Sequence, residues 1–374
     1  MGNYKAGAYK QQYKYKSFLP SSVNQSYQWE DARISLLLEE ANRFLGELNA
    51  YSKFIPEVDF FIHMHILKES TTSNRIEGTL TSIDEAVLSE AEISPEKKDD
   101  WQEVQNYTKA MNFAIKQLDE LPLSTRLLKG AHSVLLQGVR GKNKQPGEVR
   151  KSQNWIGGPS PADAFFVPPA HEDLAELLSD LEKFWHNENL EIPELIKVAI
   201  SHYQFETIHP FLDGNGRIGR LLITLHLISK GILIKPTLYL SDFFDKNRGS
   251  YYDALTMVRT SNDMDQWIRF FLVGVRDTAK NSKETLEKIV EIRTQAEAKI
   301  SQLGKRSENA QKLLKLLYTK PIINTKDIQE QLEVTNQTAN QLIRDFISLG
   351  LLNESKKIKN IQLYVFAEYF NLFV

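Results

Sequence analysis

The chain has 374 residues, of which 41% are hydrophobic and 25% charged, and a formal net charge of −2 at pH 7. These values are typical of a globular protein of two or three domains, and the near-neutral charge gives no electrostatic case for bulk binding to nucleic acid or to an acidic membrane. The sequence has no cysteine, no apolar run as long as a membrane helix and no signal-peptide core at its start, so we expect a cytoplasmic protein without disulfides, thiolate metal sites or membrane contact.

The first hundred residues predict an arm followed by helices. Residues 1–28 are rich in Tyr, Lys, Gln and Ser and lack a helical period, which predicts an extended arm lying over the surface. Residues 30–50 and 58–77 carry apolar side chains at helical spacing. The second of these helices ends at Gly78, which suits the residue that follows a helix. Taken alone, Glu77 is a solvated residue at that helix end.

The middle of the chain alternates helices with one irregular segment. Residues 101–118 and 123–137 predict two amphipathic helices. Residues 138–170 are then interrupted by many glycines and prolines, and two short extended stretches, 154–156 and 164–167, flank a Gly-Gly-Pro-Ser-Pro turn. This pattern predicts a β-hairpin with a long loop, and the alternative is an ordinary surface excursion.

The most informative stretch is the loop His-Pro-Phe-Leu-Asp-Gly-Asn-Gly-Arg-Ile-Gly-Arg, residues 209–220, between two helical segments. Its glycines permit a tight turn whose backbone N–H groups, with the start of the following helix, form a nest for phosphates. Arg217 and Arg220 lie three apart, so both can reach the same anion. Asp213 offers a carboxylate of the kind that Mg²⁺ prefers, and His209 can take a proton near neutral pH.

These twelve residues match, at every defined position, the Fic family signature His-Pro-Phe-x-Asp-Gly-Asn-Gly-Arg-x-x-Arg, and the chain therefore resembles Fic proteins. The resemblance implies a mainly α fold, a helical bundle with a β-hairpin flap, that transfers AMP from ATP to a hydroxyl group of a protein. It implies that His209 is the general base and that Asp213 holds Mg²⁺. The nucleotide-binding residues that it implies are Gly214, Asn215, Gly216, Arg217, Ile218, Gly219, Arg220, Tyr251 and Tyr252. For the two tyrosines, core packing is an almost equal interpretation.

Two further segments gain a role from the same resemblance. Ser73, Glu77 and Gly78 match the family's inhibitory motif, Ser/Thr-x-x-x-Glu-Gly/Asn, which implies that Glu77 pairs with Arg220 and excludes the γ-phosphate of ATP. The predicted hairpin corresponds to the flap, which holds the target segment by strand addition. The flap residues implied in target docking are Asn154, Trp155, Ile156, Phe166 and Val167.

The last hundred residues predict a connector and a small module. Residues 276–303 are rich in Lys and Glu with a helical period, which predicts a connecting helix leaving the catalytic domain. Residues 306–374 predict three helices and then two strands, 351–355 and 361–366, which is a winged helix-turn-helix pattern. Such modules bind DNA or proteins, and the few cations on the presumed recognition helix leave both partners open.

We therefore expect an N-terminal arm and helices with the inhibitory helix (1–100), a Fic catalytic domain (101–275), a connecting helix (276–305) and a winged-helix domain (306–374). The expected function is a protein adenylyltransferase that uses ATP and Mg²⁺, is inhibited by Glu77, and modifies a Ser, Thr or Tyr of a protein target. Self-modification and a homodimer are compatible with the sequence. The alternatives are removal of AMP in the same site and a nucleotide-sensing DNA-binding regulator. One family branch transfers phosphate instead and has a larger basic residue in place of Gly216.

Overall fold

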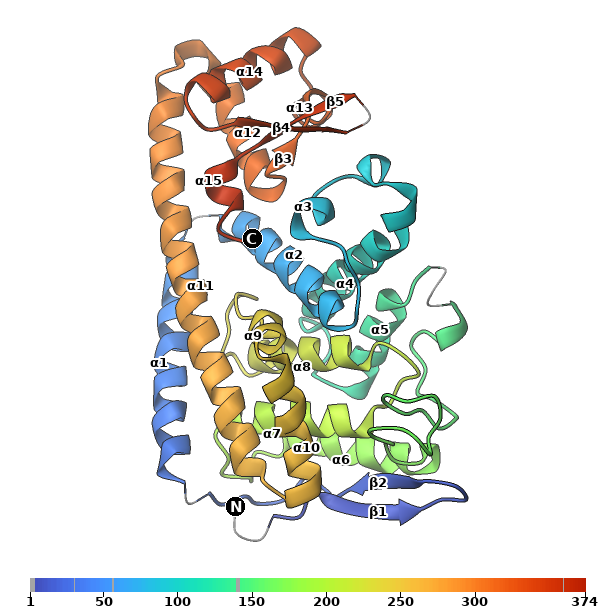
Figure 1. Ribbon diagram of the computed structural model, residues 1–374. Helices are drawn as coiled ribbons and strands as arrows, with labels where there is room; N and C mark the ends of the chain where they lie inside the picture. The colour runs from blue at the N-terminus through green and yellow to red at the C-terminus, as the bar shows by residue number, and fades with distance from the viewer. Residues whose placement is uncertain (1–3, 30, 56, 139–141, 359) are drawn as a thin grey trace.

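Two long helices run side by side along one edge of the computed structural model, which describes residues 4–29, 31–55, 57–138, 142–358 and 360–374 (Figure 1). They are α1, Ala32–Phe54, and α11, Met264–Ser301. Glu40 pairs with Arg276 at 3.0 Å and Glu47 with Lys283 at 3.0 Å, so the two helices are parallel. The predicted connecting helix is thus the second part of α11, which packs on α1 from its start.

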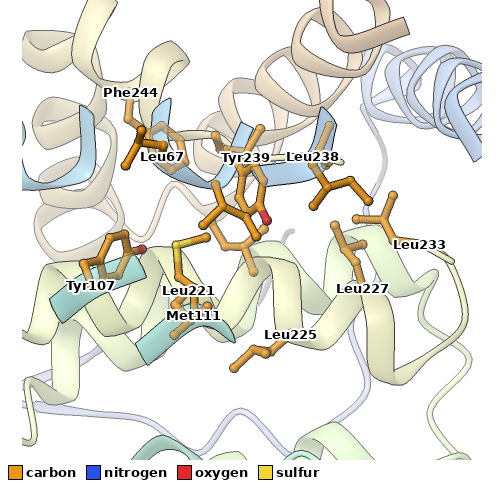
Figure 2. Close-up of a cluster of buried hydrophobic side chains, with 14 of the residues drawn as sticks. Leu67, Tyr107, Met111, Leu221, Leu225, Leu227, Leu233, Leu238, Tyr239 and Phe244 are labelled. Atoms are coloured by element: carbon orange, nitrogen blue, oxygen red, sulfur yellow. The ribbon is translucent and has the colours of Figure 1, made fainter. Parts of the chain in front are cut away.

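The helices around the signature loop form the core of the molecule. α7 and α8 are joined by that loop, and α2, α4, α5 and α6 surround them. Their bounds are Val58–Ile76 (α2), Lys98–Gln117 (α4), Thr125–Leu135 (α5), Leu174–His186 (α6), Glu194–Ile208 (α7) and Asn215–Ser229 (α8). Figure 2 shows a cluster in which apolar side chains from α2 and α4 meet α8 and the segment after it; the labelled members are Leu67, Tyr107, Met111, Leu221, Leu225, Leu227, Leu233, Leu238, Tyr239 and Phe244. Burial of this apolar surface holds α2 against α8.

Short helices complete this part of the chain. α3, Ile83–Ala86, follows the turn at Gly78. α9, Ser241–Lys246, packs on α2, and α10, Arg248–Ser261, packs on α11. Among the described residues, no helix combines the length and the apolar character that crossing a membrane would require. The prediction of a mainly helical fold is confirmed.

The N-terminal arm, predicted to be extended, is folded back on itself, which was not predicted. It contains an antiparallel hairpin of β1, Gly7–Gln11, and β2, Lys16–Pro20, in which Tyr9 lies opposite Phe18. The predicted flap is present as a single antiparallel bridge between Ile156 and Phe166, in which the Ile156 N–H donates to the Phe166 carbonyl at 2.8 Å.

The C-terminal module has the predicted order of helices and hairpin, with two additions and one shift. Its elements are α12 (Ser307–Thr319), β3 (Ile322–Ile323), α13 (Thr325–Leu332), α14 (Asn336–Ser348), β4 (Asn353–Ile358), β5 (Ile361–Val365) and α15 (Ala367–Phe370). The strands pair antiparallel in the order β3-β5-β4. β3 and α15 were not predicted, and β4 begins two residues later and ends three residues later than the predicted strand over 351–355.

Candidate functional site

The signature loop is held in shape by its own side chains. His209, directly after α7, adopts the left-handed conformation (φ 50°), and so does Gly214, directly before α8 (φ 76°). The buried amide of Asn215 closes the loop, because it accepts from the Phe211 N–H and donates to the Phe211 carbonyl, both at 2.8 Å. Asn215 was predicted to bind nucleotide, but its side chain is committed to the loop.

Two buried residues that the sequence analysis did not single out as site residues also fix the loop. His132 on α5 donates from Nε2 to the Asp213 carbonyl at 3.0 Å and stacks on Phe211 with ring centroids 3.8 Å apart. Arg150 donates from Nε to the His209 carbonyl at 3.0 Å and from Nη2 to the Pro169 carbonyl at 2.6 Å. Because its donors meet main-chain carbonyls on both sides, Arg150 joins the base of the flap to the loop.

His209 has the tautomer that a general base requires. Its Nδ1 lies 3.2 Å from the Glu206 carbonyl, which can only accept, so Nδ1 carries the proton and Nε2 has a free lone pair. Burial lowers the pKa of His209 to about 4, against a smaller opposing effect of that hydrogen bond. The ring is therefore neutral at pH 7.

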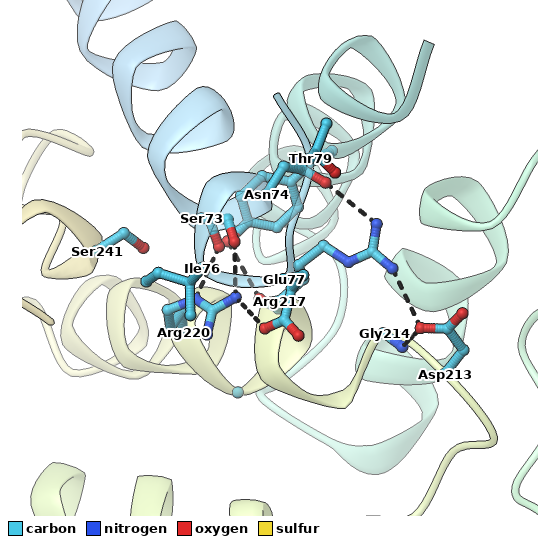
Figure 3. Close-up of polar contacts among 12 residues, drawn as sticks. Ser73, Asn74, Ile76, Glu77, Thr79, Asp213, Gly214, Arg217, Arg220 and Ser241 are labelled. Carbon is cyan, nitrogen blue, oxygen red and sulfur yellow. Dashed lines mark hydrogen bonds and ion pairs between the residues drawn. The ribbon is translucent and has the colours of Figure 1, made fainter. Parts of the chain in front are cut away.

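Arg220 is buried between α8 and the end of α2 (Figure 3). Its Nε donates to Ser73 Oγ at 2.8 Å, and its Nη2 donates to the Ser73 carbonyl at 2.9 Å and to Glu77 Oε1 at 2.6 Å. Burial, the largest single cause, raises the pKa of the Glu77 carboxyl, but the charge and hydrogen bond of Arg220 together with the charge of Arg217 outweigh it, so the net pKa is lowered. The structure thus brings together the predicted pair of Glu77 and Arg220.

The Glu77 carboxylate lies in the glycine turn itself. A Cβ built on Gly216 would lie 2.4 Å from Glu77 Oε1 and 3.1 Å from Arg220 Nη1. The lack of a side chain at Gly216 therefore leaves the space that Glu77 occupies. Gly78, with φ 98°, allows the chain to turn away directly after Glu77.

Arg217 and Asp213 line the open side of the loop (Figure 3). Arg217 Nη1 donates to Asn74 Oδ1 at 3.1 Å, and its Nη2 lies 3.3 Å from Asp213 Oδ1. The Asp213 side chain is 44% exposed and also accepts from the Gly214 N–H at 2.6 Å. A groove between α4, α5 and the loop reaches both residues.

The other predicted nucleotide-binding residues are mostly internal. Tyr251 is buried, and its hydroxyl lies 2.9 Å from His202 Nε2. Its ring therefore belongs to the core and is not accessible to the adenine base of a nucleotide in this arrangement. Tyr252 is 43% exposed, and its ring centroid lies 5.2 Å from that of Tyr251. Ile218 is a core residue, and Gly219 gives room to Glu206, whose Oε1 would lie 2.1 Å from a Cβ at that position.

The predicted flap residues divide into two groups. Trp155 and Ile156 are exposed, as a docking surface requires. Phe166 and Val167 are buried, and Asn154 donates its amide to the His209 and Phe211 carbonyls at 3.2 and 2.9 Å. These last three therefore anchor the flap instead of facing a partner.

The fold and the loop define a helical protein in which a neutral histidine stands beside a glycine turn at the start of a buried helix. Residues 35–116 match the family model described as Fic/DOC family N-terminal, and residues 122–227 match the Fic/DOC family model, together about half of the chain. The chain belongs to the Fic/DOC family.

Curated relatives match the region around the loop. The protein adenylyltransferase Fic of Aedes aegypti is 34% identical over 125 residues, which are 33% of this chain and 22% of that protein. The protein adenylyltransferase fic-1 of Caenorhabditis elegans is 28% identical over 149 residues, 39% of this chain and 25% of that protein. The matched region thus spans about a quarter or less of the length of these relatives.

Solved structures are similar in fold over a larger part of the chain. A Fic family protein from Desulfovibrio desulfuricans has a TM-score of 0.56 at 20% identity, covering 91% of this chain and 98% of that one. A fragment of Fic-1 from C. elegans has a TM-score of 0.51 at 22% identity, covering 67% of this chain and 72% of that one. At these identities the likeness shows the fold alone.

The enclosure of His209 leads to a direct prediction about its titration. Its pKa of about 4, below the ordinary 6.5, means that the ring should stay neutral from about pH 8 down to about pH 5.5. Imidazole NMR signals followed through a pH titration measure this, with His209→Ala identifying the resonance. A midpoint between about pH 6 and pH 7 would contradict the prediction and would show a solvated ring.

Proposed function

We propose that this protein is a protein adenylyltransferase, which transfers AMP from ATP to a hydroxyl group of a protein target. The observation that carries the proposal is the free Nε2 of His209 beside a turn that presents backbone N–H groups and two arginines. Purely binding a nucleotide needs no base at this position. The names of the curated relatives support the same activity.

In the proposed reaction, His209 Nε2 accepts the proton of the target hydroxyl as its oxygen attacks the α-phosphorus. The new bond joins this oxygen to phosphorus, and the bond from the α-phosphorus to the bridging oxygen of the β-phosphate breaks, so that diphosphate leaves. The N–H groups of Gly214 to Gly216 and the guanidinium groups of Arg217 and Arg220 would hold the phosphates. Such catalysis depends on positioning and on charge stabilisation.

The residues of the loop fit a magnesium ion that arrives with ATP. Among the described residues there is no cluster of three or more His, Cys, Asp or Glu side chains able to hold a metal by themselves. Asp213 offers a single, partly exposed carboxylate beside the turn, and Mg²⁺ commonly takes one or two carboxylates together with substrate phosphates. When bound, the ion would neutralise phosphate charge.

We further propose that the arrangement described is the inhibited one. The Arg220 donors Nε and Nη2 are engaged by Ser73 and Glu77, and the Glu77 carboxylate lies in the turn that phosphates would enter. ATP would have to displace this carboxylate to bring its γ-phosphate to Arg220. The exposed flap residues Trp155 and Ile156 would contact the target.

His209→Ala should abolish AMP transfer and leave ATP affinity nearly unchanged, because the base is lost and the phosphate contacts remain. A general base contributes ~10²–10⁴ in rate. Transfer is measured with ATP labelled on the α-phosphate, and binding by calorimetry. Wild-type rates in the variant would overturn the assignment.

Asp213→Ala should shift the magnesium dependence of transfer to higher concentrations, because one of the few protein oxygens available to the ion is removed. Asp213→Asn is the matched variant that keeps the shape and loses the charge. Magnesium titrations identical to wild type for both variants would show that the ligand lies elsewhere.

Glu77→Gly should raise transfer and tighten ATP binding, because Arg220 and the space at Gly216 become free. Relief of ~1.4–2.8 kcal/mol corresponds to roughly a ten- to hundredfold gain. Glu77→Gly/His209→Ala should bind ATP as tightly but remain inactive. Equal initial rates for wild type and Glu77→Gly at saturating ATP would mean that Glu77 does not inhibit.

A further inference from the structure

The N-terminal hairpin has a composition that the proposed function does not explain. Residues 4–16 contain four lysines and four tyrosines, and the first acidic residue of the whole chain is Glu30. In a protein with a net charge of −2, this is a local concentration of positive charge.

The root of this hairpin is anchored and its tip is exposed. Ala6 and Phe18 are buried, and the Ala6 N–H donates to Asn262 Oδ1 at 2.8 Å. Tyr13 at the tip is 93% exposed. Lys14 and Lys16 are exposed, and the described part of the chain gives neither of them a carboxylate partner. The tip therefore presents cations whose charge is not neutralised locally.

The hairpin continues the flap as one layer. The Phe18 N–H donates to the Val167 carbonyl at 2.9 Å, and the Phe18 ring lies between Tyr9 and Phe166, with centroids 5.2 and 6.3 Å away. Since the Phe18 N–H points away from β1, Tyr9 opposite it turns its own N–H and C=O to the outer edge of β1. The layer thus ends in an edge with free backbone groups.

Large exposed apolar side chains gather on these two hairpins. Five of them are Tyr9, Tyr13, Trp155, Ile156 and Phe165. Apolar side chains gathered in this way on a surface mark an interaction site. Lysines around aromatic rings favour a partner with negative charge, since charge complementarity guides encounter and selects partners.

We propose that the N-terminal hairpin is a second docking element for the protein target and that it selects segments rich in Asp and Glu. This inference rests on the proposed function. Because the hairpin adjoins the flap, the molecule that binds the hairpin is taken to be the same protein target. The acidic segment lies across Lys14 and Lys16, and the free edge of β1 offers backbone hydrogen bonds to it.

The test uses a fluorescein-labelled random copolymer of glutamate and tyrosine, added to the full-length protein without ATP. Lys14→Glu/Lys16→Glu should weaken binding roughly tenfold or more, and raised salt should weaken binding to wild type. Lys280→Glu/Lys288→Glu makes the same change of charge at exposed positions on α11 and should leave affinity within about twofold. In a parallel assay with ATP, self-modification is measured for Glu77→Gly alone and for Glu77→Gly combined with each pair of charge reversals.

Equal losses in the two charge-reversal variants would overturn the proposal, since only general charge would then matter. Absence of binding to wild type would also overturn it, and tighter binding of a single-stranded oligonucleotide of equal charge would replace it with a nucleic-acid surface. If the Glu77→Gly protein transfers no AMP but still binds the copolymer, the proposed function is contradicted and the docking surface is not.

A separate set of contacts joins the C-terminal module to the inhibitory helix. Phe61 on α2 packs edge-on against Tyr318 with centroids 4.9 Å apart, and His65 packs in the same way on Phe373 at 5.2 Å. Beyond the helix, the buried Asn324 amide donates to Glu92 Oε1 at 3.0 Å. The module thus holds the chain on both sides of Ser73 and Glu77.

We infer that the C-terminal module keeps α2 in the position in which Glu77 reaches Arg220. This regulation rests on the proposed inhibition, and hydrogen exchange tests the contact itself. Phe373→Ala should speed amide exchange over residues 70–77 and tighten ATP binding several-fold in the His209→Ala background.

Phe61→Ala, which removes the other aromatic contact, should act in the same direction. Ile328→Ala cuts a side chain buried in the module, on α13, and should leave exchange over residues 70–77 unchanged. Unchanged exchange over residues 70–77 in both contact variants would overturn the inference. Faster exchange without tighter ATP binding would show that the contact holds α2 but that inhibition does not depend on it.

Discussion

The buried guanidinium of Arg220 is the constraint on which the site depends. Its side chain is 2% exposed, and a buried charge is tolerated only with close partners. Removing one partner of a buried pair costs about 3–5 kcal/mol, and less here because the Glu77 side chain is 37% exposed and partly screened by water. An anion must therefore replace Glu77 whenever it leaves. In the proposed function a nucleotide phosphate supplies that replacement, so the Glu77 carboxylate and ATP would compete for the Arg220 guanidinium.

The loop that positions His209 is held by buried contacts that need no ligand. Arg150, His132 and Asn215 each fix the loop through main-chain carbonyls or N–H groups, so the position of His209 does not depend on a bound ligand. Preorganised groups of this kind lose little entropy when a substrate arrives.

The sequence predicted the helices and the loop because both leave local signals. Apolar spacing placed α2 within a few residues of its bounds and indicated a helix on each side of the loop. The resemblance of Ser73, Glu77 and Gly78 to the family's inhibitory motif implied the pairing of Glu77 with Arg220. The N-terminal hairpin was missed because its Gln-Tyr-Lys turn lacks the Asn-Gly or Asp-Gly signal of a tight hairpin. The roles of Arg150 and His132 depend on contacts with distant segments, which spacing does not reveal. For Tyr251, an aromatic residue looks the same in sequence whether it faces a base or the core.

The close approach of α7 and α8 links two positions of the sequence. The Glu206 carboxylate fills the space that a side chain at position 219 would need, and burial raises its pKa to about 7. A larger residue at 219 can be accommodated only if residue 206 becomes smaller or the helices move apart, which would shift His209, one turn further along α7, against Arg220 on α8. Among related proteins that differ at these positions, residues 206 and 219 are thus expected to change together during evolution.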